Sequence, residues 1–172
     1  LHDTLLHGQS YPSKARVDAS RICITGRSSG GLTVLCALIQ YPDIFCAASS
    51  SYGISDLKSL SQHTHKYELH YTTTLMGGTY EDLPGVYKAR SALHHADKIR
   101  TPLLLLQGDQ DRVVAPDQSR RMARAIESHA GKIKYIEFPS EGHGFRRSDT
   151  RQRALEEEFA WCNDAARIPE VC

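Results

Sequence analysis

Four consecutive leucines follow Pro102, so the run from Pro102 to Gln107 carries an apolar side chain at nearly every position. Side chains of a strand alternate between its two faces, and a strand of this composition is therefore apolar on both. Such strands are buried between the helices that cover the two sides of a parallel sheet. The run predicts the interior of a sheet of the α/β class.

Short β-rich runs alternate with longer helical patterns along the chain, which also indicates a parallel sheet with helical connections. The expected strands are residues 21–25, 45–50, 102–107 and 133–138, and the expected helices are residues 30–40, 117–129 and 150–166. In the last helix, Asp149 has the chemistry of an N-cap, and Leu155, Phe159 and Cys162 recur at helical spacing. Residues 55–90 are irregular, and we interpret them as a lid-like insertion over the sheet.

The composition excludes several classes of function. The 172 residues, 40% hydrophobic and 24% charged, are typical of one globular domain. Lys and Arg total 21 against 20 for Asp and Glu, so no excess of positive charge is available to hold nucleic acid. No apolar stretch is long enough to cross a bilayer, and no secretion signal opens the chain. We therefore expect a cytoplasmic protein with no membrane contact.

The segment Gly26-Arg27-Ser28-Ser29-Gly30 fits the pattern G-x-S-x-G, between an expected strand and an expected helix. A serine at such a turn has strained backbone geometry, and glycines two residues before and after it let the helix and the strand approach. Gly26 and Gly30 meet that need around Ser28, whereas Ser29 has Arg27 in the first of these positions. Ser28 is the candidate nucleophile, and the backbone N–H of Ser29 is placed beside it as an oxyanion donor.

A serine hydroxyl becomes an effective nucleophile only when a base removes its proton. Asp111 and His143 each follow an expected strand. Because the carboxyl ends of parallel strands meet at one edge of the sheet, we expect both side chains near Ser28. Asp111 would accept the Nδ1 proton of His143, whose Nε2 would take the proton of Ser28. Asp109 is the competing choice for the acid.

Five segments, GRSSGGLTVL, HKYELHY, YKARSALHHADKI, TPLLLLQGDQDRVVAPDQS and EGHGF, together cover most of the chain. In this combination the chain resembles the serine peptidases of the prolyl oligopeptidase group, especially the dipeptidyl-peptidase and acylaminoacyl-peptidase branch. In that family the acid is the third residue after the glycine that ends its strand, which is Asp111 here. The resemblance implies an α/β-hydrolase fold, a mostly parallel sheet with flanking helices, that hydrolyses short peptides through an acyl-enzyme on Ser28, without a cofactor.

The chain also departs from the family's pattern. A complete member has further strands before the nucleophile strand, and a loop after one of them supplies a second oxyanion donor. Only 27 residues precede Ser28. We therefore expect residues 1–172 to be a single, partial catalytic domain, the C-terminal part of the α/β-hydrolase domain. The strand at Arg21 to Thr25 would then be an unpaired edge that binds the missing N-terminal half or a second copy.

Three residues are candidates for contacts with a peptide substrate. Tyr67 and Tyr71, in the lid-like insertion, could line a pocket for the residue before the scissile bond, or simply pack within the insertion. Arg27 could contact a substrate carboxylate or carbonyl, or form a surface salt bridge. The histidines of the insertion are not accompanied by carboxylates or cysteines at ligand spacing, so no metal is expected.

Two other functions remain open. Esterases and dienelactone-type hydrolases share the serine turn and the chain order Ser, Asp, His. A chain that lacks the first half of its sheet could instead be a non-catalytic interaction module. The first alternative predicts turnover of simple esters, and the second predicts no covalent labelling of Ser28.

Overall fold

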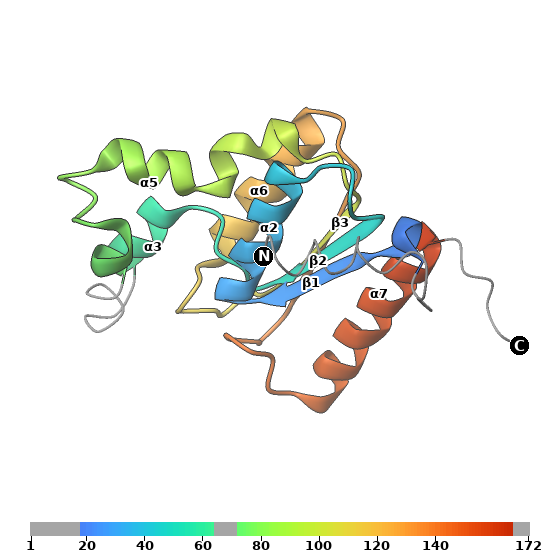
Figure 1. The fold of residues 1–172 in the computed structure, drawn as a ribbon. Helices are drawn as coiled ribbons and strands as arrows, with labels where there is room; N and C mark the ends of the chain where they lie inside the picture. The colour runs from blue at the N-terminus through green and yellow to red at the C-terminus, as the bar shows by residue number, and fades with distance from the viewer. Residues whose placement is uncertain (1–17, 64–71, 167–172) are drawn as a thin grey trace, which may run out of the picture.

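A computed structural model describes residues 18–63 and 72–166, which form a four-stranded sheet in the order β1-β2-β3-β4 (Figure 1). The strands are β1 (Cys23–Arg27), β2 (Ala47–Ser51), β3 (Leu103–Gly108) and β4 (Ile133–Phe138). Each neighbouring pair is parallel, so each connection crosses from one end of the sheet to the other. The carboxyl ends of all four strands therefore lie at one edge, where Ser28, Asp111 and His143 follow.

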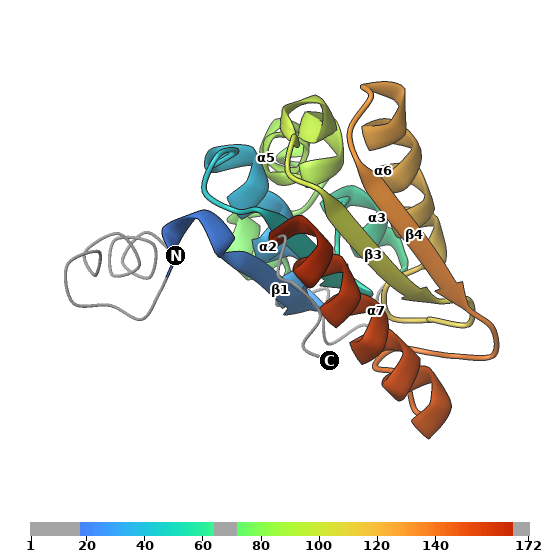
Figure 2. The same ribbon diagram turned by 90° about the vertical axis from the view of Figure 1, so that its right-hand side faces the viewer.

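Helices cover both faces of the sheet (Figures 1 and 2). They are α2 (Ser29–Gln40) and α6 (Pro116–Ser128) on one face and α7 (Ser148–Ala166) on the other. Leu103 and Leu105 of β3 pack in a core with α2 and α6, while Leu104 and Leu106 pack in a second core with α7. All four leucines are at most 2% exposed. The predicted α/β sheet with an interior leucine strand is confirmed.

The first strand begins two residues later than the sequence predicts. Arg21 is the last residue of a 3-10 turn, η1 (Ala19–Arg21). The carboxylate of Asp18 holds this turn, because it accepts hydrogen bonds from Ser20 N at 2.9 Å and from Arg21 Nε at 2.7 Å. β1 is the edge strand of the sheet formed by the described residues, and it leads directly to Ser28.

The N-cap predicted for α7 is wrong, and Leu155 and Phe159 of its apolar stripe do not pack on the sheet, whereas Cys162 lies against Cys23 of β1. The helix begins one residue before Asp149, which lies in its first turn rather than at its N-cap. Leu155 and Phe159 are 57% and 69% exposed. The helix is instead held through the small, buried Ala154 and through Trp161, both of which pack in the core on its face of the sheet. Helical spacing identified an apolar stripe but not the side that meets the sheet.

The segment interpreted as a lid contains several short helices. They are α3 (Leu57–His63), a helix over residues 72–76 and α5 (Pro84–Arg90), followed by η2 (Ala92–Lys98), which leads to β3. The start of the segment is anchored on α6: Ser55 N donates to Gln118 Oε1 at 2.8 Å, and Arg121 bonds the Asp56 carboxylate at 2.9 Å. In Figure 1, α3 and α5 lie to one side, next to α2. A lid function for this segment stays a prediction.

Candidate active site

Ser28 forms the turn between the last residue of β1 and the first residue of α2. Its backbone angles are φ 53° and ψ −120°, a region that residues with a side chain rarely adopt. The N–H of Ser28 donates to Ser51 O at 3.0 Å, and its carbonyl accepts from Gly31 N at 2.9 Å. The strained turn is therefore held by β2 on one side and by α2 on the other.

Glycines make this turn possible, but they are not the pair that the sequence pattern suggested. A Cβ on Gly26 would lie 2.3 Å from Gly30 O, and a Cβ on Gly31 would lie 2.5 Å from Ser50 Oγ. Both distances are too short for any side chain. A Cβ on Gly30 would meet no atom of the described residues within 4 Å. Close approach of α2 to the sheet therefore requires Gly26 and Gly31, whereas Gly30 contributes only its backbone.

The three candidate catalytic residues form one chain of hydrogen bonds. His143 Nε2 lies 2.9 Å from Ser28 Oγ, and His143 Nδ1 lies 2.8 Å from Asp111 Oδ2. Asp111 is in the loop after β3, and His143 is in the loop after β4, as the parallel sheet predicts. The geometry suits proton transfer from the serine hydroxyl to an imidazole whose other nitrogen donates to a carboxylate. The catalytic roles themselves stay predictions.

The carboxylate of Asp111 is buried and surrounded by donors. Its Oδ1 accepts hydrogen bonds from Val113 N and Val114 N, both at 2.9 Å. Burial by itself raises the pKa of Asp111, but the hydrogen bonds from His143, Val114 and Val113 outweigh it and hold that pKa below its usual range. The carboxylate is therefore ionised at neutral pH, which is what the orientation of a histidine base requires.

Asp109, the competing acid, occupies a different environment. It is exposed, and its backbone N–H donates to Phe138 O at 3.1 Å. Asp111 is 5% exposed and holds the histidine ring directly. The geometry therefore favours Asp111, in agreement with the family pattern.

A buried carboxylate shapes the loop that carries the histidine. Glu141 is 1% exposed, and its side chain accepts from Arg146 N at 2.8 Å and from Arg147 N at 3.0 Å. Burial raises the pKa of Glu141, but these two bonds and one from the Thr150 hydroxyl outweigh it, so that the pKa lies below its usual range. Glu141 precedes His143 in the loop, and Arg146 and Arg147 follow it. Their hydrogen bonds therefore join the two ends of the loop and restrict the position of the His143 ring.

An aromatic ring supports the histidine from the end of β2. The Tyr52 ring centroid lies 4.7 Å from that of His143 and 5.0 Å from that of Phe145, in both cases edge-on. Tyr52 adopts φ 41°, and its N–H bonds Leu106 O. Strain of this kind persists where the surroundings impose it. Here it places the Tyr52 ring against the imidazole.

Next to Ser28 is an apolar cavity of about 270 Å³. Ser28, Ser29 and Thr72 are its polar lining residues among those described. The apolar wall includes Leu32, Ile54, Leu57, Met76 and Val114. An acyl group attacked by Ser28 has room there for an apolar side chain, and Ser29, as the first residue of α2, has a backbone N–H that precedes the hydrogen bonds of the helix.

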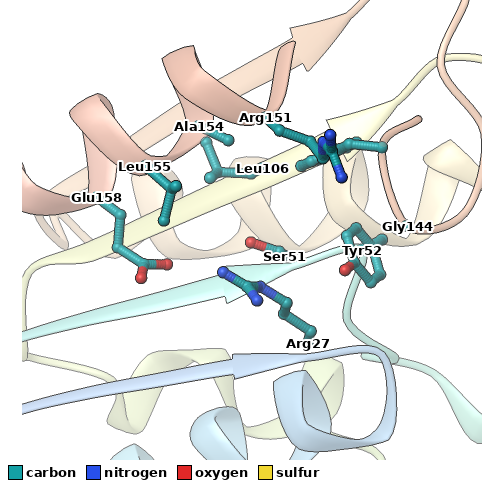
Figure 3. A pocket seen from close by; sticks show the side chains of 10 residues that line it. Arg27, Ser51, Tyr52, Leu106, Gly144, Arg151, Ala154, Leu155 and Glu158 are labelled. Carbon is teal, nitrogen blue, oxygen red and sulfur yellow. The ribbon is translucent and has the colours of Figure 1, made fainter. Parts of the chain in front are cut away.

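Arg27 lines a different cavity, of about 210 Å³, on the α7 face of the sheet. Figure 3 shows its guanidinium group between Ser51 and the carboxylate of Glu158, with Tyr52 and Arg151 farther along the cavity. Arg27 is not among the residues that line the cavity at Ser28. A contact between Arg27 and a substrate stays a prediction. Tyr67 and Tyr71 lie outside the described residues.

Sequence reasoning missed three side chains: Tyr52 and Gln107, which contact His143 and Asp111, and Glu141, which bonds the backbone of the loop after His143. The position of Glu141, two residues before the candidate base, was a usable signal, and so was Gln107 as a polar residue inside an otherwise apolar strand. Tyr52 gave no such signal, because its contact with the histidine depends on the packing of two loops.

Two other kinds of site are absent from the described ranges, 18–63 and 72–166. No helix within them combines the length and apolar composition needed to cross a bilayer. Nor do these ranges hold three or more His, Cys, Asp or Glu side chains grouped as metal ligands.

The fold defines the class of the protein. A serine at a strained strand-to-helix turn, with an acid and a histidine after later strands of the same parallel sheet, is the arrangement of the α/β-hydrolases. Within that class, the chain belongs to the prolyl oligopeptidase family, whose family model matches residues 2–168.

Similar proteins are much longer than this chain. A puromycin-hydrolyzing peptidase of Mycobacterium tuberculosis has a structure that is 40% identical over 95% of this chain, with a TM-score of 0.87. Dipeptidyl aminopeptidase BIII of Pseudoxanthomonas mexicana is 31% identical over 157 residues, or 88% of this chain. The chain covers 25% and 23% of these two proteins. Esterase LipQ of Mycobacterium tuberculosis is 28% identical over 74% of this chain, which covers 34% of that protein.

Proposed function

We propose that this chain carries the catalytic residues of a serine peptidase that hydrolyses short peptides. The observation that supports this most directly is the continuous hydrogen-bonded path from Ser28 through His143 to the buried Asp111. A nucleophile, a base and an orienting carboxylate in that arrangement are the groups that acyl transfer to a serine uses. Membership of a peptidase family supports the peptide bond as the target.

In the proposed reaction, Ser28 Oγ attacks the substrate carbonyl while His143 Nε2 takes the hydroxyl proton. The negative charge that develops on the carbonyl oxygen is stabilised by the backbone N–H of Ser29. His143 then returns the proton to the leaving amine as the C–N bond breaks, which leaves an acyl-enzyme on Ser28. Water, activated by the same imidazole, releases the acid and restores the serine. Asp111 holds the ring in the required tautomer throughout and stays ionised.

The apolar cavity beside Ser28 supports a preference for an apolar residue before the scissile bond. Among the described residues that line it, the leucine, isoleucine, methionine and valine side chains offer no charged partner. A charged side chain would lose its hydration there without a compensating contact. We therefore expect peptides with Phe, Leu or Met at that position to be cleaved in preference to peptides with Asp or Lys.

An esterase is the second candidate, and the similarity to esterase LipQ favours it. An ester is cleaved by the same acyl-enzyme route, and its alcohol is an easier leaving group than an amine. The two candidates are separated by comparing the ratio of kcat/KM for an apolar dipeptidyl anilide and for p-nitrophenyl acetate. Hydrolysis of the ester alone would favour the esterase.

Labelling with a fluorophosphonate tests the proposed nucleophile. The reagent should modify the purified chain at Ser28, and Ser28→Ala should abolish the modification. Ser29→Ala is the matched control, because it removes the adjacent hydroxyl but keeps the backbone N–H. Modification mapped to Ser29, or labelling that survives in Ser28→Ala, would contradict the assignment. A folded chain that is not labelled at all would favour a non-catalytic module.

A further inference from the structure

A buried amide lies directly behind the carboxylate of the candidate acid. Gln107, on β3, is 0% exposed. Burial of an amide is costly unless its hydrogen bonds are made. Nε2 of Gln107 lies 3.1 Å from Asp111 Oδ2, and it is 3.3 Å from the carbonyl oxygens of Gly108 and Val114.

The orientation of this amide is fixed by its surroundings. Ser119 on α6 donates its hydroxyl to Gln107 Oε1 at 2.8 Å. If the amide were flipped, its carbonyl oxygen would face three acceptors and its NH₂ group would lose the Asp111 carboxylate. The NH₂ group has two hydrogens for three acceptors. The ionised Asp111 oxygen is the nearest of the three, and a hydrogen bond to a charged acceptor is the strongest.

One oxygen of Asp111 therefore serves two donors. Oδ2 accepts from His143 Nδ1 and from Gln107 Nε2, while Oδ1 is held by the backbone. We propose that Gln107 is a positioning residue for the Asp111–His143 pair, whose amide fixes Oδ2 and moderates how strongly that oxygen holds the imidazole proton. This inference rests on the proposed function, in which the pair prepares Ser28 for attack.

The proposal predicts a change in titration when the donor is removed. Gln107→Met keeps an unbranched side chain of similar length but has no N–H. Without the amide donor, the negative charge on Oδ2 would interact more strongly with a protonated His143 ring. The Asp111 carboxylate would also be less stabilised and would accept a proton more easily. Both effects raise the pH at which the Asp111–His143 pair loses its proton. We expect the titration midpoint of the His143 ring to rise by about half a pH unit, the size expected for one lost hydrogen bond.

Ser119→Ala is the matched control. It removes the other hydrogen bond of the same buried amide, while the carbonyls of Gly108 and Val114 still favour the orientation of the NH₂ group. We expect it to lower the melting temperature about as much as Gln107→Met does, and to leave the titration midpoint unchanged. Equal shifts in the two variants would overturn the proposal, because the effect would then come from loosened packing.

Other charged and titratable groups around the pair stay constant in this comparison. They are Arg27 at the end of β1, Tyr52 after β2, Glu158 on α7, Glu141 after β4, and the exposed neighbours Asp109 and Arg112. Neither substitution removes any of them. A difference between the two variants therefore reports the loss of the amide donor.

The experiment is an NMR titration of the full chain, with the ring signal of His143 assigned by its disappearance in His143→Asn. In the unmodified protein, the Gln107 side-chain amide signal should move with the same midpoint. This measurement tests the proposal even if Gln107→Met does not fold. An amide signal whose chemical shift does not change as His143 titrates would overturn the proposal. The titration does not require turnover. Absence of phosphonate labelling would defeat the proposed function, whereas the amide titration would still decide the role of Gln107.

Discussion

The Nε2 atom of His143 lies 2.9 Å from the Oγ atom of Ser28, although 115 residues separate them in the chain. Two parallel strands lie between β1 and β4 in the sheet, so the two loops approach each other over the carboxyl ends of β2 and β3. The contact depends on the strained turn at Ser28 and on the loop that Glu141 closes. Each of these features can be tested separately.

Asp111→Asn should lower kcat/KM, or the rate of phosphonate labelling, by about 10⁴-fold, the loss typical of a histidine left in the wrong tautomer. Asp109→Asn is the matched control and should stay within about twofold, because the exposed Asp109 does not hold the ring. Rates for both variants are compared at one pH above neutrality. A large loss in the control with a small loss in Asp111→Asn would reverse the assignment of the acid.

Gly26→Ala should destabilise the protein, because its Cβ would lie 2.3 Å from the backbone oxygen of Gly30. Overpacking of this kind costs about 1 to 3 kcal/mol. Gly30→Ala adds the same methyl group where no atom of the described part of the chain lies within 4 Å, and it should be neutral or stabilise α2 by up to about 1 kcal/mol. Urea unfolding followed by circular dichroism gives both values. Equal destabilisation by the two would show that the turn packs differently.

Glu141→Gln should reduce the dependence of stability on pH. The pKa of Glu141 is lowered in the folded protein, so the ionised carboxylate stabilises the fold at pH values above its unfolded pKa, about 4.3. That contribution is lost as the pH falls through the lower, folded value. The variant should therefore be less stable at pH 7, and the difference should narrow below about pH 4.

Urea titrations of both proteins at pH 7, 5 and 3 provide this measurement. Glu81→Gln, at an exposed position in a turn, is the control and should leave stability nearly unchanged at all three values. A gap between Glu141→Gln and the unmodified chain that widens toward pH 3 would contradict the sign derived for Glu141.

We propose that the edge of β1, which no other described strand covers, mediates association, either with further parts of a longer protein or with a second copy. Thr25 is exposed on this edge strand, and a lysine there should hinder pairing with another strand. In sedimentation velocity experiments, Thr25→Lys should shift the chain toward monomer. Thr33→Lys, at an exposed position on α2, should not. A chain that is monomeric without any substitution would refute self-association.

Much of the site could be predicted because its signals are local. The glycine pattern around Ser28, and the placement of Asp111 and His143 after β-rich runs, are properties of short segments. A parallel sheet then brings the ends of such segments together without further information. The two acids near the end of β3 were harder to distinguish from spacing, since they are two residues apart. The family pattern favoured Asp111, and its burial agrees with that choice.

Other features could not be predicted from spacing. Leu155 and Phe159 share a helical stripe but are exposed, because α7 meets the sheet through Ala154 instead. Gly30 matches the motif, but a side chain there would meet no described atom, whereas a side chain at Gly31 would clash with Ser50. In each case the sequence pattern predicted the helix or turn correctly but not which of its residues pack against the sheet.

By itself, the sequence determined the class of fold, the order of strands and helices, and the chemistry available at the ends of the strands. These follow from hydrophobic periodicity and from glycine positions, which act over a few residues. Only the tertiary structure decided which glycines are crowded, that Asp111 is buried while Asp109 is exposed, and that Gln107 and Glu141 hold the loops carrying the candidate catalytic residues. Those outcomes depend on distances between segments far apart in the chain, and such distances are set by the packing of helices against the sheet.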